Sequence, residues 1–234
     1  MRTYLFYFKF ILFMIKSQFN RIKLNRLMKK SPEEAAIYIE KYVKKWSKFV
    51  IYNIPVNIKV EGLENVPEEA CLFVGNHQSF VDIPVFVNVF PRTVGFVAKK
   101  ELATLPIITF WMKAIGCVFI DRENPREGIK SILEGAKNLK EGRSMVIFPE
   151  GTRSKSSNMA EFKKGTLKMA QKSGSPIVPV TLDGTYKAYE YDGNKIKNAD
   201  VKVIIHKPIY INELTKEEKD NIHVIVHDII KKDL

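Results

Sequence analysis

Apolar and polar residues follow two different patterns along the chain, and the change falls at Pro55. Before it, apolar residues from Ile39 to Val50 recur three and four positions apart, which is the spacing of one face of a helix. The Ser-Pro-Glu-Glu stretch at 31–34 offers an N-cap, a first-turn proline and the third position of a capping box. Together with the apolar run at 4–15, this pattern predicts a hairpin of two helices.

After Pro55, short β-rich runs alternate with segments of helical length. This alternation is typical of an α/β domain built on a largely parallel central sheet with helices on both faces. We therefore predict two parts, an N-terminal helical hairpin at 1–54 and an α/β domain at 55–234. The expected strands are Ile58–Val60, Ala70–Val74, Val94–Ala98, Cys117–Ile120, Met145–Phe148, Ile177–Thr181 and Val201–Ile205, and the expected helices are Leu102–Ile115, Pro125–Lys140, Phe162–Ser173 and one from the capping box at 215–218 to about Lys232.

Positive charge is concentrated in the predicted hairpin. The chain has a formal net charge of +12, and its first fifty residues hold twelve Lys and Arg against three Glu. Cations beside a dense aromatic and aliphatic run suit a lipid interface, where lysines meet headgroup phosphates and rings enter the acyl boundary. The basic residues do not accompany a recognisable nucleic-acid-binding module, so they favour an anionic membrane surface over nucleic acid as the partner.

The apolar run at 4–15 is too short to cross a bilayer. A spanning helix needs about 20 apolar residues, whereas this run has twelve positions with Lys9 among them. The stretch that follows, Lys-Ser-Gln-Phe-Asn at 16–20, has no small-residue cleavage pattern of a signal peptide. We therefore expect a retained interfacial helix and a peripheral, monotopic protein on the cytoplasmic face of the cell membrane. The alternatives are a signal or spanning segment, and surface helices packed on the main domain.

Composition excludes several other classes of protein. With 45% hydrophobic and 27% charged residues, the chain is not of the disordered or low-complexity type. Cys71 and Cys117 lie in apolar runs and are expected to be small core residues, without a disulfide framework or a zinc cluster. His223 and His227 have a spacing able to bind a metal, but the sequence offers no third ligand, so no metal site is predicted.

The carboxyl ends of the predicted strands are the places to look for chemistry, because ligands of parallel sheets gather there. At one of these ends Gly75 permits a tight turn, and His77 and Asp82 follow, five residues apart. If His77 precedes a helix and Asp82 lies in its first turns, the carboxylate can reach back to the imidazole. A histidine held by a carboxylate is the usual arrangement of a general base; the alternative is a histidine satisfied within a structural network.

No serine or cysteine nucleophile accompanies this pair in the sequence. The chain has no Gly-x-Ser-x-Gly elbow, neither cysteine follows a strand end, and Ser79 is placed to cap the turn rather than to attack a substrate. The base would therefore have to activate a hydroxyl of the substrate itself. This implies direct group transfer without a covalent enzyme intermediate.

Cations follow three other predicted strands. Lys99 and Lys100 follow one strand, Arg122 another, and the Glu-Gly-Thr-Arg turn at 150–153 a third. The planar fork of an arginine suits a phosphate, and the backbone amides of a glycine turn add donors. If the sheet is parallel, these groups converge beside His77 and form a cationic pocket suited to a phosphate-bearing alcohol. The alternative is that each of these loop cations is simply solvated and binds no ligand.

Five blocks of the chain together resemble the glycerolipid acyltransferases. The His-x4-Asp pair is a weak signal alone, but joined to the FPEGTRS block in this order it is highly specific. The resemblance covers about residues 55–210, and the whole chain is most similar to the bacterial members that acylate 1-acyl-sn-glycerol 3-phosphate. The blocks are NHQS with Asp82 (76–82), GFVAKKEL (95–102), FIDR (119–122), FPEGTRS (148–154) and IVPVT (177–181), in the family's order and at similar spacing.

The resemblance implies transfer of a fatty acyl group from an acyl thioester to the sn-2 hydroxyl of lysophosphatidic acid, giving phosphatidic acid in phospholipid biosynthesis. It implies that His77 removes the hydroxyl proton and that Asp82 orients His77. No cofactor is implied beyond the acyl-CoA or acyl carrier protein that brings the acyl group. The residues implied to hold the acceptor's phosphate, or to shape the turn that does so, are Lys99, Arg122, Glu150, Gly151, Thr152 and Arg153.

Two other functions stay open at this point. An enzyme of the same chemistry could acylate glycerol 3-phosphate or another lysophospholipid, because only the acceptor pocket distinguishes these substrates. A non-catalytic protein that binds anionic lipid through its basic hairpin would leave His77 without a chemical role.

Overall fold

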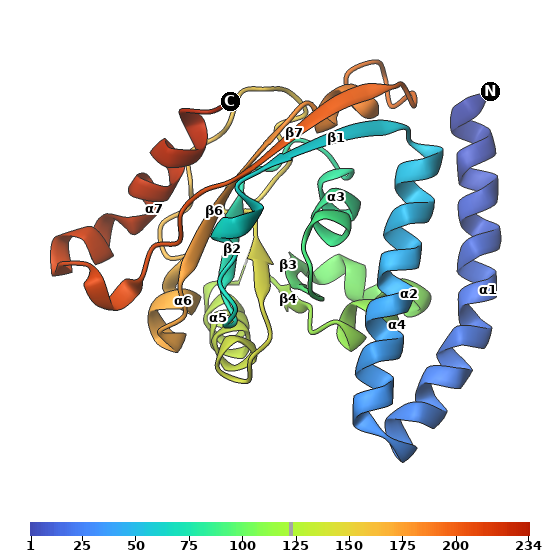
Figure 1. Cartoon of the computed structure of the whole chain (residues 1–234), viewed down its shortest axis with the longest axis horizontal. Coiled ribbons are helices and arrows are strands. Elements are labelled where there is room, and N and C mark those ends of the chain that lie inside the picture. Colours follow the sequence, from blue (N-terminus) through green and yellow to red (C-terminus); the bar gives the residue numbers. More distant parts are fainter. Residues whose placement is uncertain (122–123) are drawn as a thin grey trace.

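A central sheet carries helices on both faces in the computed structural model, which describes residues 1–121 and 124–234 (Figure 1). Over these residues the sheet has seven strands, one at each position expected from the sequence, and the predicted α/β fold class is confirmed. The strands are β1 (Val56–Glu61), β2 (Leu72–Gly75), β3 (Gly95–Lys99), β4 (Val118–Ile120), β5 (Met145–Ile147), β6 (Ile177–Asp183) and β7 (Ala199–Ile205).

The helices include the two predicted for the N-terminal hairpin and one that begins at Asp82. The last helix begins at the predicted capping box, where the Thr215 hydroxyl accepts the backbone N–H of Glu218 and the Glu218 carboxylate accepts that of Thr215. The helices are α1 (Arg2–Lys30), α2 (Pro32–Asn53), α3 (Asp82–Val89), α4 (Pro106–Ala114), α5 (Pro125–Lys140), α6 (Lys168–Ser173) and α7 (Lys216–Lys231).

Two of the expected helices are shorter in the structure. The helix expected at Leu102–Ile115 is interrupted at Leu105, because the proline that follows favours an extended backbone there (φ −98°, ψ 92°), and α4 begins at that proline. The helix expected at Phe162–Ser173 is reduced to α6, because Gly165 adopts a φ of 93°, outside the helical region.

The strand order places the ends of five strands along one edge of the sheet. The order is β1-β7-β6-β2-β5-β3-β4, and within it β6 and β7 form the antiparallel pair. The pairs that join β2, β3, β4, β5 and β6 are all parallel. The loops that leave the carboxyl ends of these five strands therefore begin at the same edge, as the sequence analysis required for a shared site.

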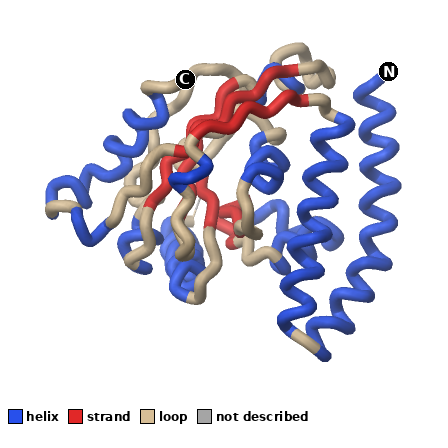
Figure 2. Tube along the Cα trace, in the orientation of Figure 1, coloured by secondary structure: helices blue, strands red, loops and turns tan. Residues whose placement is uncertain are grey.

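Helices lie on both faces of the sheet (Figure 2), and a hydrophobic layer separates the sheet from the helices on each face. On one face, Phe73 of β2 packs in the same core as Phe86 of α3 and Val50 of α2. On the other face, Ile147 of β5 shares a core with residues of α5, α6 and α7, such as Val226. Each of these strand residues is at most 5% exposed, so the central strands are covered on both sides.

The hairpin turns at Ser31, which ends α1 and caps α2. The Ser31 hydroxyl accepts the backbone N–H of Glu34 at 3.3 Å, as predicted. The Ser31 N–H, however, donates to the carbonyl of Leu27 at 2.8 Å. Glu34 therefore does not close the capping box expected from the sequence, because the amide it would bind is already used by the end of α1.

Helix α2 is joined to α3 by hydrogen bonds as well as by apolar packing. The buried Ser47 hydroxyl donates to the carbonyl of Pro84 at 2.7 Å. Lys44 donates to the carbonyls of Asn88 and Phe90 at the end of α3, where a cation also meets the negative end of the helix dipole. The hairpin is thus part of the core that supports α3.

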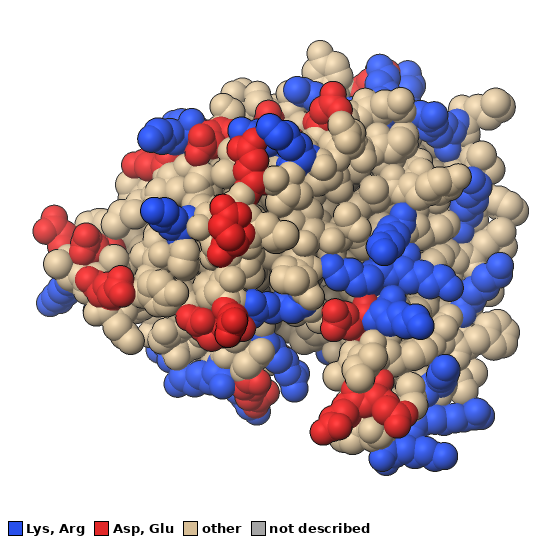
Figure 3. Space-filling model, in the orientation of Figure 1, with Lys and Arg blue, Asp and Glu red and all other residues tan. Residues whose placement is uncertain are grey.

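Helix α1 leaves a long apolar stripe uncovered. Lys and Arg side chains gather over the two hairpin helices (Figure 3). Among the described residues, no helix is both long and apolar enough to cross a membrane. The stripe follows helical spacing along the outer side of α1 and consists of Leu5, Phe8, Leu12, Ile15, Phe19 and Ile22, each at least 42% exposed.

Candidate active site

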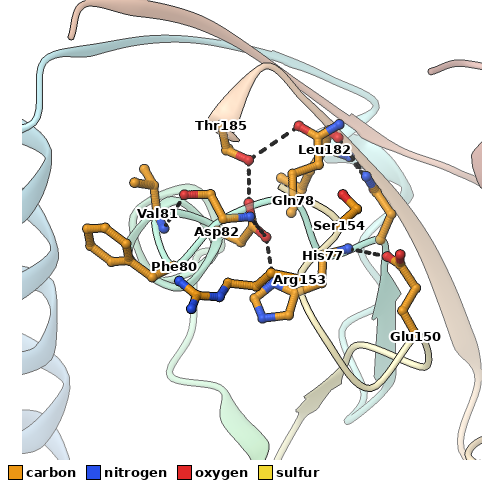
Figure 4. A network of polar contacts seen from close by, with 12 residues as sticks. His77, Gln78, Phe80, Val81, Asp82, Glu150, Arg153, Ser154, Leu182 and Thr185 are labelled. Atoms are coloured by element: carbon orange, nitrogen blue, oxygen red, sulfur yellow. Dashed lines mark hydrogen bonds and ion pairs between the residues drawn. The ribbon is translucent and has the colours of Figure 1, made fainter. Parts of the chain in front are cut away.

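His77 and Asp82 meet where β2 passes into α3 (Figure 4). His77 Nδ1 lies 2.6 Å from Asp82 Oδ2, and the Asp82 side chain is fully buried whereas that of His77 is 17% exposed. The His77 ring stacks on the ring of Phe148, with centroids 4.2 Å apart and planes 12° apart. The carboxylate and the phenyl ring together fix the orientation of the imidazole.

Asp82 accepts hydrogen bonds on both carboxylate oxygens. Its Oδ2 accepts the backbone N–H of Ser79 at 2.9 Å in addition to His77, and its Oδ1 accepts the Thr185 hydroxyl at 2.5 Å. Asp82 also lies in the first turn of α3, where the helix dipole favours a negative charge. With this acceptor at Nδ1, His77 carries its proton on Nδ1 and leaves Nε2 as the basic nitrogen.

The other ring nitrogen of His77 faces away from Asp82 (Figure 4). Among the described residues, no side chain or backbone group forms a hydrogen bond with this Nε2. A neutral imidazole with its Nδ1–H held by a carboxylate and its Nε2 unoccupied can accept a proton from a bound hydroxyl.

The loop that carries His77 is tied to the neighbouring strand β6. The Asn76 side chain donates to the carbonyl of Leu182 and accepts the N–H of the same residue, each at 2.8 Å. The side-chain oxygen of Gln78 (Oε1) accepts the backbone N–H of Gly184 at 2.9 Å. Both amide side chains are 1% exposed, so the residues on either side of His77 are fixed in the interior.

Glu150 clamps this loop to the one that follows β5. Its carboxylate is 4% exposed and accepts the backbone N–H of His77 at 2.6 Å and that of Ala160 at 2.9 Å. Burial raises the pKa of the Glu150 carboxyl, and the two backbone hydrogen bonds counteract the rise in part. Both carboxylate oxygens of Glu150 are therefore used in holding the two loops together.

The turn after Glu150 needs a glycine. Gly151 has a φ of 75°, and a Cβ at this position would come within 3.1 Å of the Lys163 side chain. Its N–H donates to the carbonyl of Phe148 at 3.1 Å, which closes the turn. Thr152 is exposed, and the turn leads directly to Arg153.

Arg153 lies beside His77 and is held by a carboxylate from another segment. Its Nη1 is 3.0 Å from Oε1 of Glu190, and its side chain is 39% exposed. The turn that carries it lies against the His77 loop, because the backbone N–H of the next residue, Ser154, donates to the His77 carbonyl at 2.8 Å (Figure 4). The expected convergence of Arg153 with His77 is therefore present in the structure.

Of the other cations expected at this site, the structure describes Lys99 and Lys100. Lys99 is exposed at the carboxyl end of β3, on the edge of the sheet that also carries the His77 loop. Lys100 forms an ion pair with Asp121 at 2.7 Å. Arg122 lies outside the described residues. The topology thus brings Lys99 to the correct edge without a contact to His77.

Two residues that hold the site were missed by the sequence analysis. Thr185 follows the end of β6, where the rule of inspecting strand ends would have found it, but the strand was expected to end at Thr181 and continues to Asp183. Glu190 lies in an irregular segment, and nothing in its local sequence indicates a buried carboxylate.

Neither thiol belongs to the site. Cys71 and Cys117 are buried, as expected, and burial raises the pKa of both thiols to about 12, so they stay protonated and unreactive. Within the described part of the chain, no group of three His, Cys, Asp or Glu side chains could hold a metal ion.

Comparison with known families identifies the segment that carries these loops. The model of a family described as Acyltransferase matches residues 57–183. This match includes His77, Asp82, Glu150 and Arg153, whereas Thr185 and Glu190 lie just beyond it.

Curated relatives and a solved structure are similar to the chain over different shares of their length. A chloroplastic 1-acyl-sn-glycerol-3-phosphate acyltransferase of Brassica napus is 39% identical over 170 residues, which is 71% of this chain and 49% of the relative. The enzyme of the same name from Borreliella burgdorferi is 35% identical over 182 residues, 76% of this chain and 72% of the relative. The chain thus spans about half the length of the Brassica napus relative.

The solved structure is similar over almost the entire chain. The crystal structure of the 1-acyl-sn-glycerophosphate acyltransferase PlsC from Thermotoga maritima has a TM-score of 0.86 and 28% sequence identity. The similarity covers 99% of this chain and 92% of the other, so it includes the N-terminal hairpin as well as the sheet.

Proposed function

The chain belongs to the acyltransferase family, and we propose that it transfers a fatty acyl group from an acyl thioester to the sn-2 hydroxyl of 1-acyl-sn-glycerol 3-phosphate. The product is phosphatidic acid, and the step belongs to phospholipid biosynthesis. The names of its relatives support the choice of acceptor. The observation that carries the chemistry is the 2.6 Å contact between His77 and the buried Asp82.

In the proposed reaction His77 acts as a general base. Its Nε2 takes the proton of the acceptor hydroxyl while the hydroxyl oxygen attacks the thioester carbonyl carbon. The tetrahedral intermediate then collapses, the carbon–sulfur bond breaks, and the proton on His77 passes to the departing sulfur. Thiols are far more acidic than alcohols, so the thiolate leaves readily. The balance of this reaction needs only the two substrates.

Asp82 supports this role of His77 in two ways. Its Oδ2 keeps the proton of the neutral imidazole on Nδ1, which leaves Nε2 free to act as the base. Its negative charge then stabilises the imidazolium that forms when Nε2 takes the substrate proton. Both effects require the carboxylate to stay buried and correctly oriented, as its three hydrogen bonds ensure.

Arg153 is proposed to bind the phosphate of the acceptor, with Lys99 adding positive charge at the same edge of the sheet. Arg122, which lies outside the described residues, is proposed to add a further positive charge. A guanidinium can donate two parallel hydrogen bonds to a phosphate, which gives orientation as well as affinity. Gly151 and Thr152 form the turn that presents Arg153. Glu150 holds that turn to the His77 loop through its two backbone hydrogen bonds.

The hairpin is proposed to place this site at a membrane surface. The apolar stripe of α1 would enter the acyl boundary, and the surrounding Lys and Arg would bind anionic headgroups. Such peripheral, monotopic binding lets the lipid acceptor reach the site without leaving the bilayer, which would cost about 0.8 kcal/mol per methylene group. The proposed side is the cytoplasmic face, because acyl-CoA and acyl carrier protein are cytoplasmic.

A test of this function follows phosphatidic acid formed from lysophosphatidic acid and palmitoyl-CoA by the full-length protein. We expect product with the wild type, a loss of at least about a hundredfold in rate with His77→Ala, and a wild-type rate with His223→Ala, whose histidine lies on α7. Glycerol 3-phosphate and lysophosphatidylcholine are assayed in parallel. A higher rate with either of them would reassign the acceptor, and an unchanged rate with His77→Ala would remove the base from the mechanism.

A further inference from the structure

A buried carboxylate stands behind Arg153. Glu190 has a side chain only 1% exposed, and it belongs to residues 184–191, which we call the strap because they cross from the end of β6 over the start of α3. Its Oε1 accepts hydrogen bonds from Arg153 Nη1 at 3.0 Å and from the backbone N–H of Phe80 at 3.1 Å. Its Oε2 accepts the Ser79 hydroxyl at 2.5 Å.

These contacts orient the guanidinium without covering it. Glu190 uses one of the two terminal nitrogens of Arg153, and no other side chain in the described residues bonds this group. An arginine has five N–H donors in a rigid fork, so the remaining donors stay available to an anion. A guanidinium that is already held loses less conformational freedom when it binds a phosphate than a mobile one does.

The strap itself is fixed on both sides of Glu190. The Tyr189 ring meets the ring of Phe80 edge to face at 4.7 Å, and the Tyr189 hydroxyl forms a hydrogen bond with that of Tyr7 on α1. The backbone N–H of Tyr191 donates to the carbonyl of Tyr186 at 3.0 Å. Glu190 is therefore a fixed point against which Arg153 is held, rather than a side chain that follows the arginine.

We infer that Glu190 is a positioning residue of the acceptor site, which holds Arg153 in the orientation that binds the acceptor's phosphate. The inference rests on the proposed function and adds to it a residue outside the segment that the family model matches. It also explains why a carboxylate is placed beside a group meant for an anion. The Glu190 carboxylate binds one nitrogen of the guanidinium, and it also accepts hydrogen bonds from the Phe80 N–H and the Ser79 hydroxyl.

The test measures KM for a short-chain, monomeric lysophosphatidic acid and kcat at saturating palmitoyl-CoA. We expect Glu190→Ala to raise KM about tenfold, because the loss of one charge-assisted hydrogen bond is of that order, with kcat changed less than about threefold. Glu190→Gln keeps an oxygen toward Arg153 without the charge, so its KM should lie between the two, about threefold above wild type. Asp192→Asn is the matched control, because Asp192 is nearby but pairs with the exposed Lys197.

The same substitutions in an Arg153→Ala background separate positioning from a merely structural role. If Glu190 acts through Arg153, neither Glu190→Ala nor Glu190→Gln will raise KM further once the arginine is gone. A wild-type KM in both single variants, or an equal further rise in the Arg153→Ala background, would overturn the inference. Glu190→Gln keeps the shape and most contacts of the side chain, so it decides the question if Glu190→Ala does not fold. A wild type inactive on lysophosphatidic acid would instead contradict the proposed function.

Discussion

At the scale of single residues, the hydroxyl of Thr185 decides how Asp82 is oriented. Thr185 is fully buried at the start of the strap, and it donates to the Asp82 oxygen that does not face His77. The backbone N–H of Ser79 and the ring of His77 occupy the other oxygen. Without the Thr185 hydroxyl, one buried carboxylate oxygen would lack a donor, and the carboxylate could rotate away from the histidine.

We therefore predict that Thr185→Val lowers kcat about tenfold with little change in KM for the acceptor, because the proton transfer is affected and not the binding of phosphate. Thr185→Ser keeps the hydroxyl and should restore most of the rate. Thr181→Val is the matched control, since the Thr181 hydroxyl bonds His206 and the Ile230 carbonyl instead of Asp82. Equal rates in Thr185→Val and Thr185→Ser would show that the hydroxyl does not position Asp82.

The residues found from the sequence and those found only in the structure differ in where they lie. His77, Asp82 and Arg153 follow strand ends within short motifs, so local patterns were sufficient to select them. Thr185 contacts Asp82, which lies more than one hundred positions earlier in the chain. Glu190 contacts Arg153, which lies thirty-seven positions earlier. Such contacts depend on how β6 and the strap return over α3, which a sequence pattern does not reveal.

At the scale of elements, α7 is joined to the sheet by a polar contact beside the partly buried His206. The Thr181 hydroxyl on β6 donates to the Ile230 carbonyl on α7, and it accepts from His206 Nε2 at 2.8 Å. Burial lowers the pKa of His206, although Asp233 at 3.8 Å opposes the effect. The folded chain therefore resists protonation of His206 more than the unfolded chain does.

The direction of this pKa shift predicts how the stability of the protein changes with pH. Because the pKa of His206 is lower in the folded state, this histidine contributes to the free energy of unfolding above the ordinary histidine pKa. The contribution is lost as the pH falls from that value through the lower pKa of the folded state. Between pH 7 and pH 5, the wild type should lose more stability than His206→Gln, as measured by urea unfolding at each pH. His223→Gln serves as the control for removal of a histidine from α7. Parallel curves for the wild type and His206→Gln would contradict the prediction.

The elements themselves were largely predictable, and the errors have physical causes. Apolar runs located all seven strands, and the cap at Thr215 located the start of α7. The interruption before α4 and the late start of α6 arose from a proline and a glycine inside the segments predicted as helices. The antiparallel direction of β7 could not be predicted, because an apolar run does not show which strand it pairs with.

At the scale of the whole molecule, the hairpin has two surfaces with different roles. One surface belongs to the core, where Phe6, Val43 and Val50 are buried with residues of the sheet and α3. The other is the exposed apolar stripe of α1, and Lys and Arg side chains gather over the two hairpin helices (Figure 3). Removal of the hairpin would expose the core as well as abolish the stripe, so point substitutions on the stripe are the sharper test of membrane binding.

We predict that the double variant Phe8→Ser, Phe19→Ser weakens binding to anionic vesicles by at least about tenfold, because two rings no longer enter the acyl boundary. Binding of the wild type should also fall as salt is added, since the headgroup contacts are electrostatic. Sedimentation with vesicles measures both effects. The matched control is Ile129→Ser, Leu133→Ser, which removes similarly exposed apolar side chains from α5. Equal binding by the two double variants would show that α1 does not face the membrane.

The sequence predicted the two helices of the hairpin and their charge, but not how they join the rest of the chain. The hydrogen bond from Ser47 to Pro84 and those from Lys44 to the end of α3 connect α2 directly to the helix that begins at Asp82. The local sequence does not show whether a polar residue on a predicted surface helix forms such a contact or is solvated. The packing of α2 on α3 therefore emerges only from the fold.

The most direct measurement is the rate of phosphatidic acid formation by Asp82→Asn. Asparagine keeps the size of the side chain and an oxygen for Nδ1 of His77, but it removes the charge that stabilises the imidazolium. We predict a fall in kcat of about a hundredfold or more, with vesicle binding and the KM for lysophosphatidic acid close to those of the wild type. A variant that folds normally and forms phosphatidic acid at the wild-type rate would contradict it.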